Sequence, residues 1–196
     1  MAGHAGGAGG RPGNRWSPVL WSAAGLMLLA PLVATQLTDE VDWDLHDYAV
    51  FGAMLIGAGI ACEIAARRTD SAAYRAATAL AVAAAFLLLW MNLSVGLIGS
   101  EDHPANLAFD GVLAVGITGA ALARLRPLGM ARALTATALA QTLVAAAALL
   151  AGSGPAGAKG AGDILVLNGI YVMLWLTAAW LFRRAARQPS AAGSAP

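Results

Sequence analysis

Six long apolar segments, separated by short polar turns, restrict the possible folds of this chain more than any other feature of its sequence. Each has about the 20 residues that a helix needs to cross a hydrocarbon core of about 30 Å. Inside a bilayer only helices or closed barrels satisfy the backbone, and these alanine- and leucine-rich segments lack the polar–apolar alternation of barrel strands. We therefore predict six transmembrane helices, over residues 17–37, 46–66, 76–98, 106–123, 132–152 and 164–182.

The composition agrees with an all-α, polytopic membrane protein. Hydrophobic residues make up 59% of the chain and charged residues only 12%, whereas soluble domains carry about 25% charged residues. The glycine- and alanine-rich start and the polar end of the chain cannot bury a core. The predicted organisation is a disordered tail over 1–15, a six-helix transmembrane domain over 16–184 and a disordered tail over 185–196.

The arginines predict how the helices are oriented. In a six-helix chain all eleven arginines fall on one side, in the two tails and in the second-to-third and fourth-to-fifth connections. The positive-inside rule makes that side cytoplasmic, so both termini are expected in the cytoplasm. The basic turns would contact anionic lipid of the bilayer rather than nucleic acid. Cleavage of the first segment as a secretory signal is the alternative, and it would leave five helices with the N-terminus outside.

A weak internal repeat relates the middle four helices. A shift of 57 residues aligns His46 with His103, Arg67 with Arg124 and Arg75 with Arg132. Such an offset predicts a parallel repeat, in which the second and third helices superpose on the fourth and fifth about an axis along the membrane normal.

Polar side chains gather near the predicted outer ends of the helices. His103, Asn106 and Asp110 share one face of the fourth helix, because their spacings are three, four and seven residues. Ionisable groups within a membrane usually face a cavity or the bundle interior, and carboxylates and imidazoles suit a divalent cation or a proton. We therefore expect an outward-facing pocket, with His46, His103 and Asp110 pointing into the bundle. Its candidate metal ligands are His46, Asp47, Glu101, His103 and Asp110, and its other lining residues are Asn92, Asn106 and Asn168.

Two further interpretations of this group remain open. Asn and His side chains often hydrogen-bond helices together in a bilayer, so the group could be a structural network. Two histidines on equivalent helices could also ligate a haem iron. In the same stretch, Pro104 suits the first turn of a helix, which would place Asp102 or His103 near the helix cap.

The remaining motifs favour no enzymatic role. The chain has no nucleotide-binding loop, dinucleotide fingerprint, zinc-protease motif or nucleophile elbow. Glu63 and Arg67 are spaced for a helical salt bridge, and Gln141 is expected to bridge helices. The predicted activity is cation or proton handling at the outer pocket. The rival is a non-catalytic accessory subunit or scaffold, which would bind a membrane-protein partner or a second copy of the chain.

A resemblance adds a cellular location. The run from Trp90 to Leu150, which begins WMNLSVGLIGSEDHPANLAFDG, resembles a family of small, uncharacterised bacterial membrane proteins, and WDLHDYAVFGAMLIGAGIACEIAARR resembles it more loosely. The resemblance implies a multi-pass protein of the bacterial inner membrane. It implies no activity, cofactor or site residue.

Overall fold

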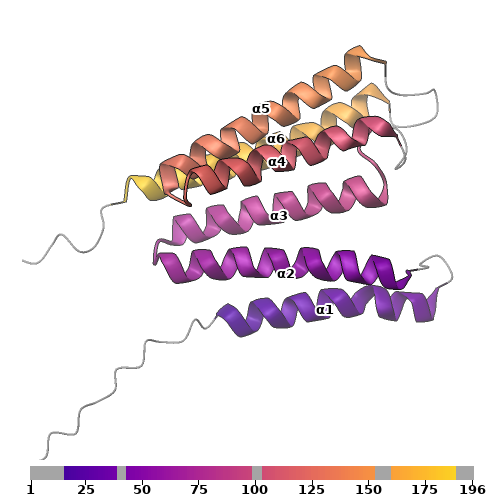
Figure 1. Ribbon diagram of the computed structural model, residues 1–196, viewed down its shortest axis with the longest axis horizontal. Helices are drawn as coiled ribbons and strands as arrows, with labels where there is room; N and C mark the ends of the chain where they lie inside the picture. The colour runs from indigo at the N-terminus through magenta and orange to yellow at the C-terminus, as the bar shows by residue number, and fades with distance from the viewer. Residues whose placement is uncertain (1–15, 39–42, 99–102, 153–159, 189–196) are drawn as a thin grey trace, which may run out of the picture. The chain divides into compact units, whose positions relative to one another are not determined.

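Each predicted apolar segment forms a helix in the computed structural model, which describes residues 16–38, 43–98, 103–152 and 160–188 (Figure 1). With the short 3-10 turn η1 counted as the start of α4, all six helices are long and apolar enough to cross a membrane, and the described residues contain no strand. The prediction of an all-α polytopic membrane protein is therefore confirmed. The elements are α1 (Trp16–Leu37), α2 (Leu45–Arg68), α3 (Ala72–Ser94), η1 (Pro104–Asn106), α4 (Leu107–Leu122), α5 (Pro127–Leu150) and α6 (Ala161–Ala186).

The chain divides into two compact units, residues 1–59 and 60–196, which are described separately. Helix α2 begins in the first unit and ends in the second, so the repeat of helices 2–3 in helices 4–5 stays a prediction. The predicted tails over 1–15 and 189–196 lie outside the described residues. The predicted C-terminal tail began at residue 185, but α6 continues to Ala186.

The first unit contains α1 and most of α2. An added Cβ on Gly59 would lie 3.1 Å from the Trp21 ring, so the glycine allows the indole of α1 to lie against α2. Trp43 stacks edge-on against Tyr48 and Phe51, with ring centroids 5.2 and 5.4 Å apart. This aromatic cluster covers the start of α2, where Phe51 is buried.

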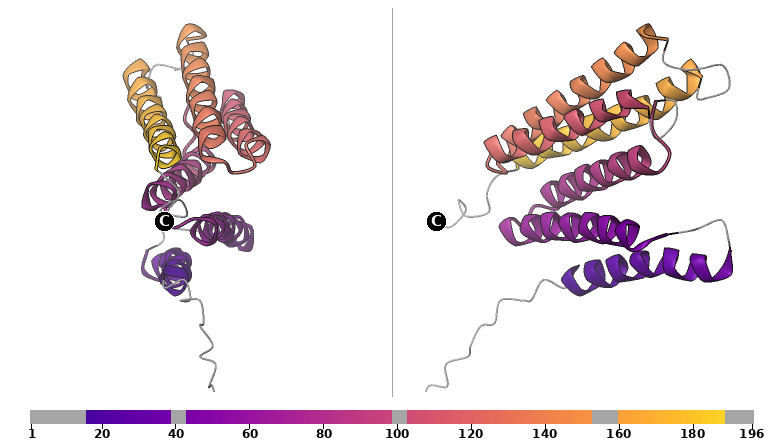
Figure 2. Two further views of the ribbon diagram at one scale, coloured as in Figure 1. Left: turned by 90° about the vertical axis from the view of Figure 1, so that its left-hand side faces the viewer. Right: turned by 45° about the vertical axis from the view of Figure 1, so that its right-hand side comes forward.

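The second unit is built on α3 to α6, which run in alternating directions. Figure 2 shows α5 between α4 and α6, and α3 packs mainly on α6. The shared core contains Tyr74 and Leu88 from α3, Phe109 from α4, and Trp175 and Phe182 from α6. The rings of Tyr74 and Phe182 meet edge to face, with centroids 5.0 Å apart. The described parts of these four helices therefore enclose an apolar interior that contains no sheet.

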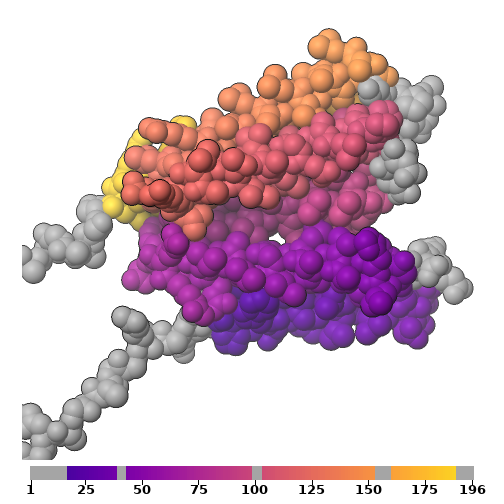
Figure 3. Space-filling model, viewed as in Figure 1, coloured from indigo at the N-terminus to yellow at the C-terminus, as the bar shows by residue number. Residues whose placement is uncertain are grey.

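Small residues bring α4 and α5 together, and the two helices lie against each other in the space-filling view (Figure 3). An added Cβ on Gly119 would lie 2.7 Å from the Cβ of Ala133 and 3.2 Å from its Cα. An added Cβ on Gly116 would lie 3.2 Å from Oγ1 of Thr137. Small residues permit such close approach of membrane helices, and this contact fixes how α4 is rotated against α5.

The arginine-bearing connections of the second unit meet at one end. The Tyr74 hydroxyl, near the start of α3, donates to the Leu125 carbonyl in the α4–α5 turn at 2.7 Å. The Ser71 hydroxyl donates to Oε1 of Gln188, beyond the end of α6, also at 2.7 Å. We call this region the basic end; its arginines are Arg67, Arg68, Arg75, Arg124, Arg126, Arg132, Arg183, Arg184 and Arg187. The predicted ion pair between Glu63 and Arg67 is also confirmed here.

Some helix boundaries differ from the apolar segments. Helix α3 ends at Ser94 rather than at residue 98, because Gly96 adopts a φ of 69° and the next two amides bond elsewhere. Helix α5 begins at Pro127 rather than at residue 132, because proline at the first position of a helix loses no hydrogen bond. A glycine and a proline therefore set these two boundaries, which apolar content alone does not predict.

Candidate functional site

The first two predicted ligands lie at the start of α2. The Asp44 amide donates to Oδ2 of Asp47 at 3.0 Å, and the Asp47 amide donates to Oδ1 of Asp44 at 3.0 Å. This reciprocal pair is a capping box, in which two side chains satisfy amides that the first helical turn leaves unpaired. The pattern Asp-x-x-Asp at residues 44–47 indicates such a capping box, but the sequence analysis did not predict it. His46, between the two aspartates, is exposed.

The next candidate, His103, caps the turn that starts α4. Its Nδ1 accepts a hydrogen bond from the Ala105 amide at 3.2 Å, and Pro104 occupies the first position of η1. The predicted roles of Pro104 and His103 at this helix start are confirmed. Glu101 and Asp102 lie outside the described residues.

The cap restricts what the His103 ring can bind. A neutral imidazole that accepts at Nδ1 carries its proton on Nε2, by inference from the hydrogen bond. A metal at Nε2 would need that proton to move to Nδ1, which would break the bond from Ala105. In this geometry Nδ1 of the imidazole is engaged by the turn, and metal or haem binding by His103 stays a prediction.

Asp110 does not point into the interior of the second unit, and its expected direction within the six-helix bundle stays a prediction. Phe109 and Val112 of α4 are 0% and 1% exposed and take the inward face. Because successive helical residues turn by about 100°, Asp110 lies on the outward side, where it is exposed. Its position in the first turn of α4 also places the carboxylate at the favourable end of the helix dipole.

The Asn92 and Asn106 side chains are buried rather than lining an open pocket. Oδ1 of Asn106 accepts from the amides of Leu97 and Ile98 at 3.1 and 2.9 Å. Nδ2 of Asn92 donates to the Asn106 carbonyl at 3.2 Å. Together they link the end of α3 and the residues just after it to the start of α4, and Leu97 and Ile98 are buried there as well.

Asn168 forms a second buried polar contact, between α5 and α6. Nε2 of Gln141 on α5 donates to Oδ1 of Asn168 on α6 at 2.8 Å, and Nδ2 of Asn168 donates to the Ile164 carbonyl at 2.8 Å. Gln141 is 0% exposed and Asn168 is 2% exposed. The prediction that Gln141 bridges helices is confirmed, and Asn168 is its partner.

Three of the five predicted metal ligands thus have local roles at helix starts: Asp47, His103 and Asp110. Within residues 16–38, 43–98, 103–152 and 160–188, no three His, Cys, Asp or Glu side chains are grouped so that they could hold a metal ion. Metal binding by His46, Asp47, Glu101, His103 and Asp110 stays a prediction, since Glu101 lies outside those ranges. The arrangement described here can cap helices and join them; of the predicted metal ligands within these ranges, His46 and Asp110 are exposed.

Comparison with protein-family models, with curated proteins and with solved structures finds no match to this chain. The resemblance to small bacterial inner-membrane proteins accordingly stays an expectation from the sequence.

Proposed function

We propose that this multi-pass membrane protein is a non-catalytic subunit or scaffold, which binds a partner within the membrane through the outward face of α4. The supporting observation is Asp110, a carboxylate exposed on a helix long and apolar enough to span the bilayer. A charge facing lipid costs about 2.5–3.5 kcal/mol at mid-bilayer on insertion scales, and less near the interface. A partner that offers a hydrogen-bond donor or a cation to Asp110 would remove that cost.

The residues around Asp110 suit contact with another helix. Ala114 and Thr118 follow Asp110 at intervals of four, so the three residues share one face, and all three are exposed. Small and hydroxyl-bearing residues allow close approach and hydrogen bonding between membrane helices. The second unit uses three buried asparagines for its own hydrogen bonds: Asn92, Asn106 and Asn168. The groups that this face presents to a partner are therefore the Asp110 carboxylate and the Thr118 hydroxyl.

Site-specific photocrosslinking in native membranes tests the subunit role. A photoreactive residue at Ala114 should give a discrete crosslinked protein, and the Asp110→Leu substitution in the same chain should weaken that product severalfold. A photoreactive residue at Leu143, an exposed apolar position on α5, serves as the matched control and should give lipid adducts. Only lipid adducts at Ala114, or crosslinks from Ala114 to residues 16–59 of the same chain, would reject the proposal.

Cation or proton handling is the second candidate, and the exposed Asp110 carboxylate and His46 imidazole favour it because both are accessible. Bound metals and the visible spectrum of the purified protein test it, with His103→Ala and Asp110→Asn as variants. Metal lost in both variants would support cation binding, and colour lost with a histidine would support haem. If the protein is colourless and metal-free, and its variants lose only thermal stability, the result would favour the role of a non-catalytic subunit.

A further inference from the structure

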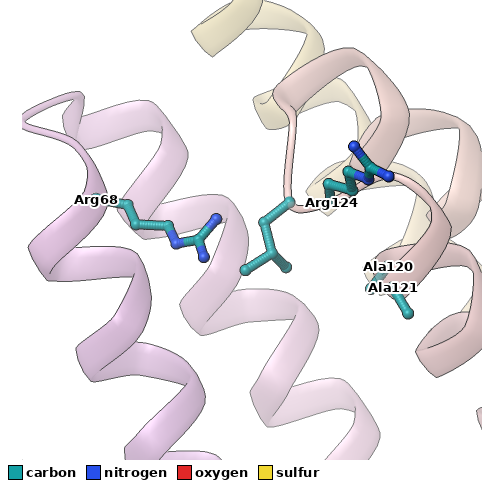
Figure 4. Close-up of a pocket in the computed structure, with 5 residues that line it drawn as sticks. Arg68, Ala120, Ala121 and Arg124 are labelled. Atoms are coloured by element: carbon teal, nitrogen blue, oxygen red, sulfur yellow. The ribbon is translucent and has the colours of Figure 1, made fainter.

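A pocket lies at the basic end of the second unit, between the end of α2 and the α4–α5 turn (Figure 4). Its volume is about 300 Å³, and its lining residues are Arg68, Ala120, Ala121, Arg124 and Leu125. Three apolar side chains form the wall, and two guanidinium groups supply all of its charge. Figure 4 shows Arg68 reaching from α2 toward the turn, while Arg124 projects from the turn itself. The guanidinium groups suit an anion, and the apolar wall suits a carbon skeleton attached to it.

Both guanidinium groups are available to a ligand. The ion pair in the described part of the chain joins Arg67 to Glu63, and Arg67 does not line the pocket. Asp70 is the acid in the connection from α2 to α3, two residues after Arg68 in the sequence. It forms no ion pair with Arg68 or Arg124. Arg68 and Arg124 are exposed, so their side chains are free to turn onto an anion.

The backbone holds Arg124 in an unusual conformation. Arg124 and Leu125 have φ values of 49° and 59°, the positive values among non-glycine residues in the described ranges. The Leu125 amide bonds to the Ala120 carbonyl and the Arg124 amide to the Ala121 carbonyl, which is the hydrogen-bond pattern of a Schellman motif. Glycine is the usual residue at the position that Arg124 occupies, because it adopts positive φ without a steric cost. An arginine there is a reason to look for a function of its side chain.

The strained turn is also fixed in place. The Tyr74 hydroxyl holds the Leu125 carbonyl at 2.7 Å, which ties the turn to the start of α3. An added Cβ on Gly129 would lie 2.7 Å from the Cβ of Ala123, so the first turn of α5 packs tightly against the end of α4. The pocket wall is therefore rigid where Arg124 leaves the backbone.

We propose that Arg68 and Arg124 bind a phosphate group in this pocket. Guanidinium groups donate paired hydrogen bonds to phosphate oxygens, and two of them balance most of the charge of a phosphomonoester. Ala120, Ala121 and Leu125 contact the carbon skeleton that carries the phosphate. The pocket lies where the membrane-spanning segments end, so a lipid headgroup and a soluble phosphate can both reach it. This site is independent of the subunit role proposed for α4.

Binding is measured on the full chain in an uncharged detergent, by thermophoresis, with two probes. Short-chain phosphatidic acid represents the lipid headgroup, and inorganic phosphate represents the soluble source. We expect Arg68→Gln and Arg124→Gly each to weaken binding of the phosphorylated probe by about tenfold or more, the usual scale for a lost charge-assisted hydrogen bond. Arg126→Gln, in the same turn but outside the pocket, is the matched control and should change affinity less than about twofold.

The Arg124→Gly variant separates binding from folding. Glycine relieves the positive φ, so the melting temperature should stay the same or rise while phosphate binding falls. Binding of phosphatidic acid alone assigns the site to lipid, and binding of both probes assigns it to the phosphate group itself. The proposal is overturned if the wild-type protein binds neither probe. It is equally overturned if Arg126→Gln weakens binding as much as the two pocket variants do.

Discussion

Asn106→Leu should be among the most destabilising single substitutions at the α3–α4 connection. In the wild-type protein one side-chain oxygen accepts from both the Leu97 and Ile98 amides, whose residues are 0% and 1% exposed. Leucine is similar in size but accepts no hydrogen bond, so both amides would be left buried and unpaired. Each unpaired amide costs about 1–3 kcal/mol. The expected loss in the free energy of unfolding is about 2–6 kcal/mol.

Asn92→Leu supplies a sharp comparison within the same network. Asn92 donates one hydrogen bond to the Asn106 carbonyl, but its Oδ1 is buried with no partner among the described atoms. Leucine would remove that unpaired oxygen together with the hydrogen bond, so the two effects offset each other. We expect a loss of less than about 1 kcal/mol.

Reversible unfolding in mixed micelles, with increasing mole fraction of a denaturing detergent, measures both effects. Asn106→Asp keeps the accepting oxygen and should retain more of the stability than Asn106→Leu does. Equal losses for Asn92→Leu and Asn106→Leu would refute the reasoning, since it assigns the stability to one accepting oxygen. A loss of less than about 1 kcal/mol for Asn106→Leu would refute it as well, because that is less than one unpaired amide costs.

Three further predictions concern helix contacts and orientation. Gly119→Ala should destabilise the protein by about 1–3 kcal/mol because α4 must move away from Ala133. Gly111→Ala is the control: its added Cβ meets nothing within 4 Å, so the substitution should be neutral or slightly stabilising. Unfolding in a denaturing detergent compares the two variants. Gln141→Leu and Asn168→Leu should show a coupling energy of about 0.6–1.7 kcal/mol in a double-mutant cycle, and additive losses would contradict the bond between them. Reporter fusions placed after residues 68, 126 and 187 should read cytoplasmic, and fusions near residues 42, 102 and 157 should read external; an external N-terminus, or a mature chain that starts near residue 35, would contradict the six-helix orientation.

The sequence alone predicted the helices and the charge segregation. Whether a segment can cross a bilayer depends on its length and hydropathy, which are local properties, so each apolar segment corresponds to one helix. The roles of Pro104, the Glu63–Arg67 pair and Gln141 were also predictable, because they follow from spacing along one helix or from burial of an amide.

Only the tertiary structure decided which way the polar side chains face and what they bond to. Residues 106, 109 and 110 are close in sequence, yet packing within the second unit buries Asn106 and Phe109 and leaves Asp110 exposed, since adjacent residues differ by about 100° around the helix. The pocket at Arg68 and Arg124 required two segments 56 residues apart to meet, and it also required a turn in which arginine adopts a positive φ. Hydropathy is insensitive to rotation about a helix axis and to long-range contacts, so neither feature could be predicted before the helices were packed together.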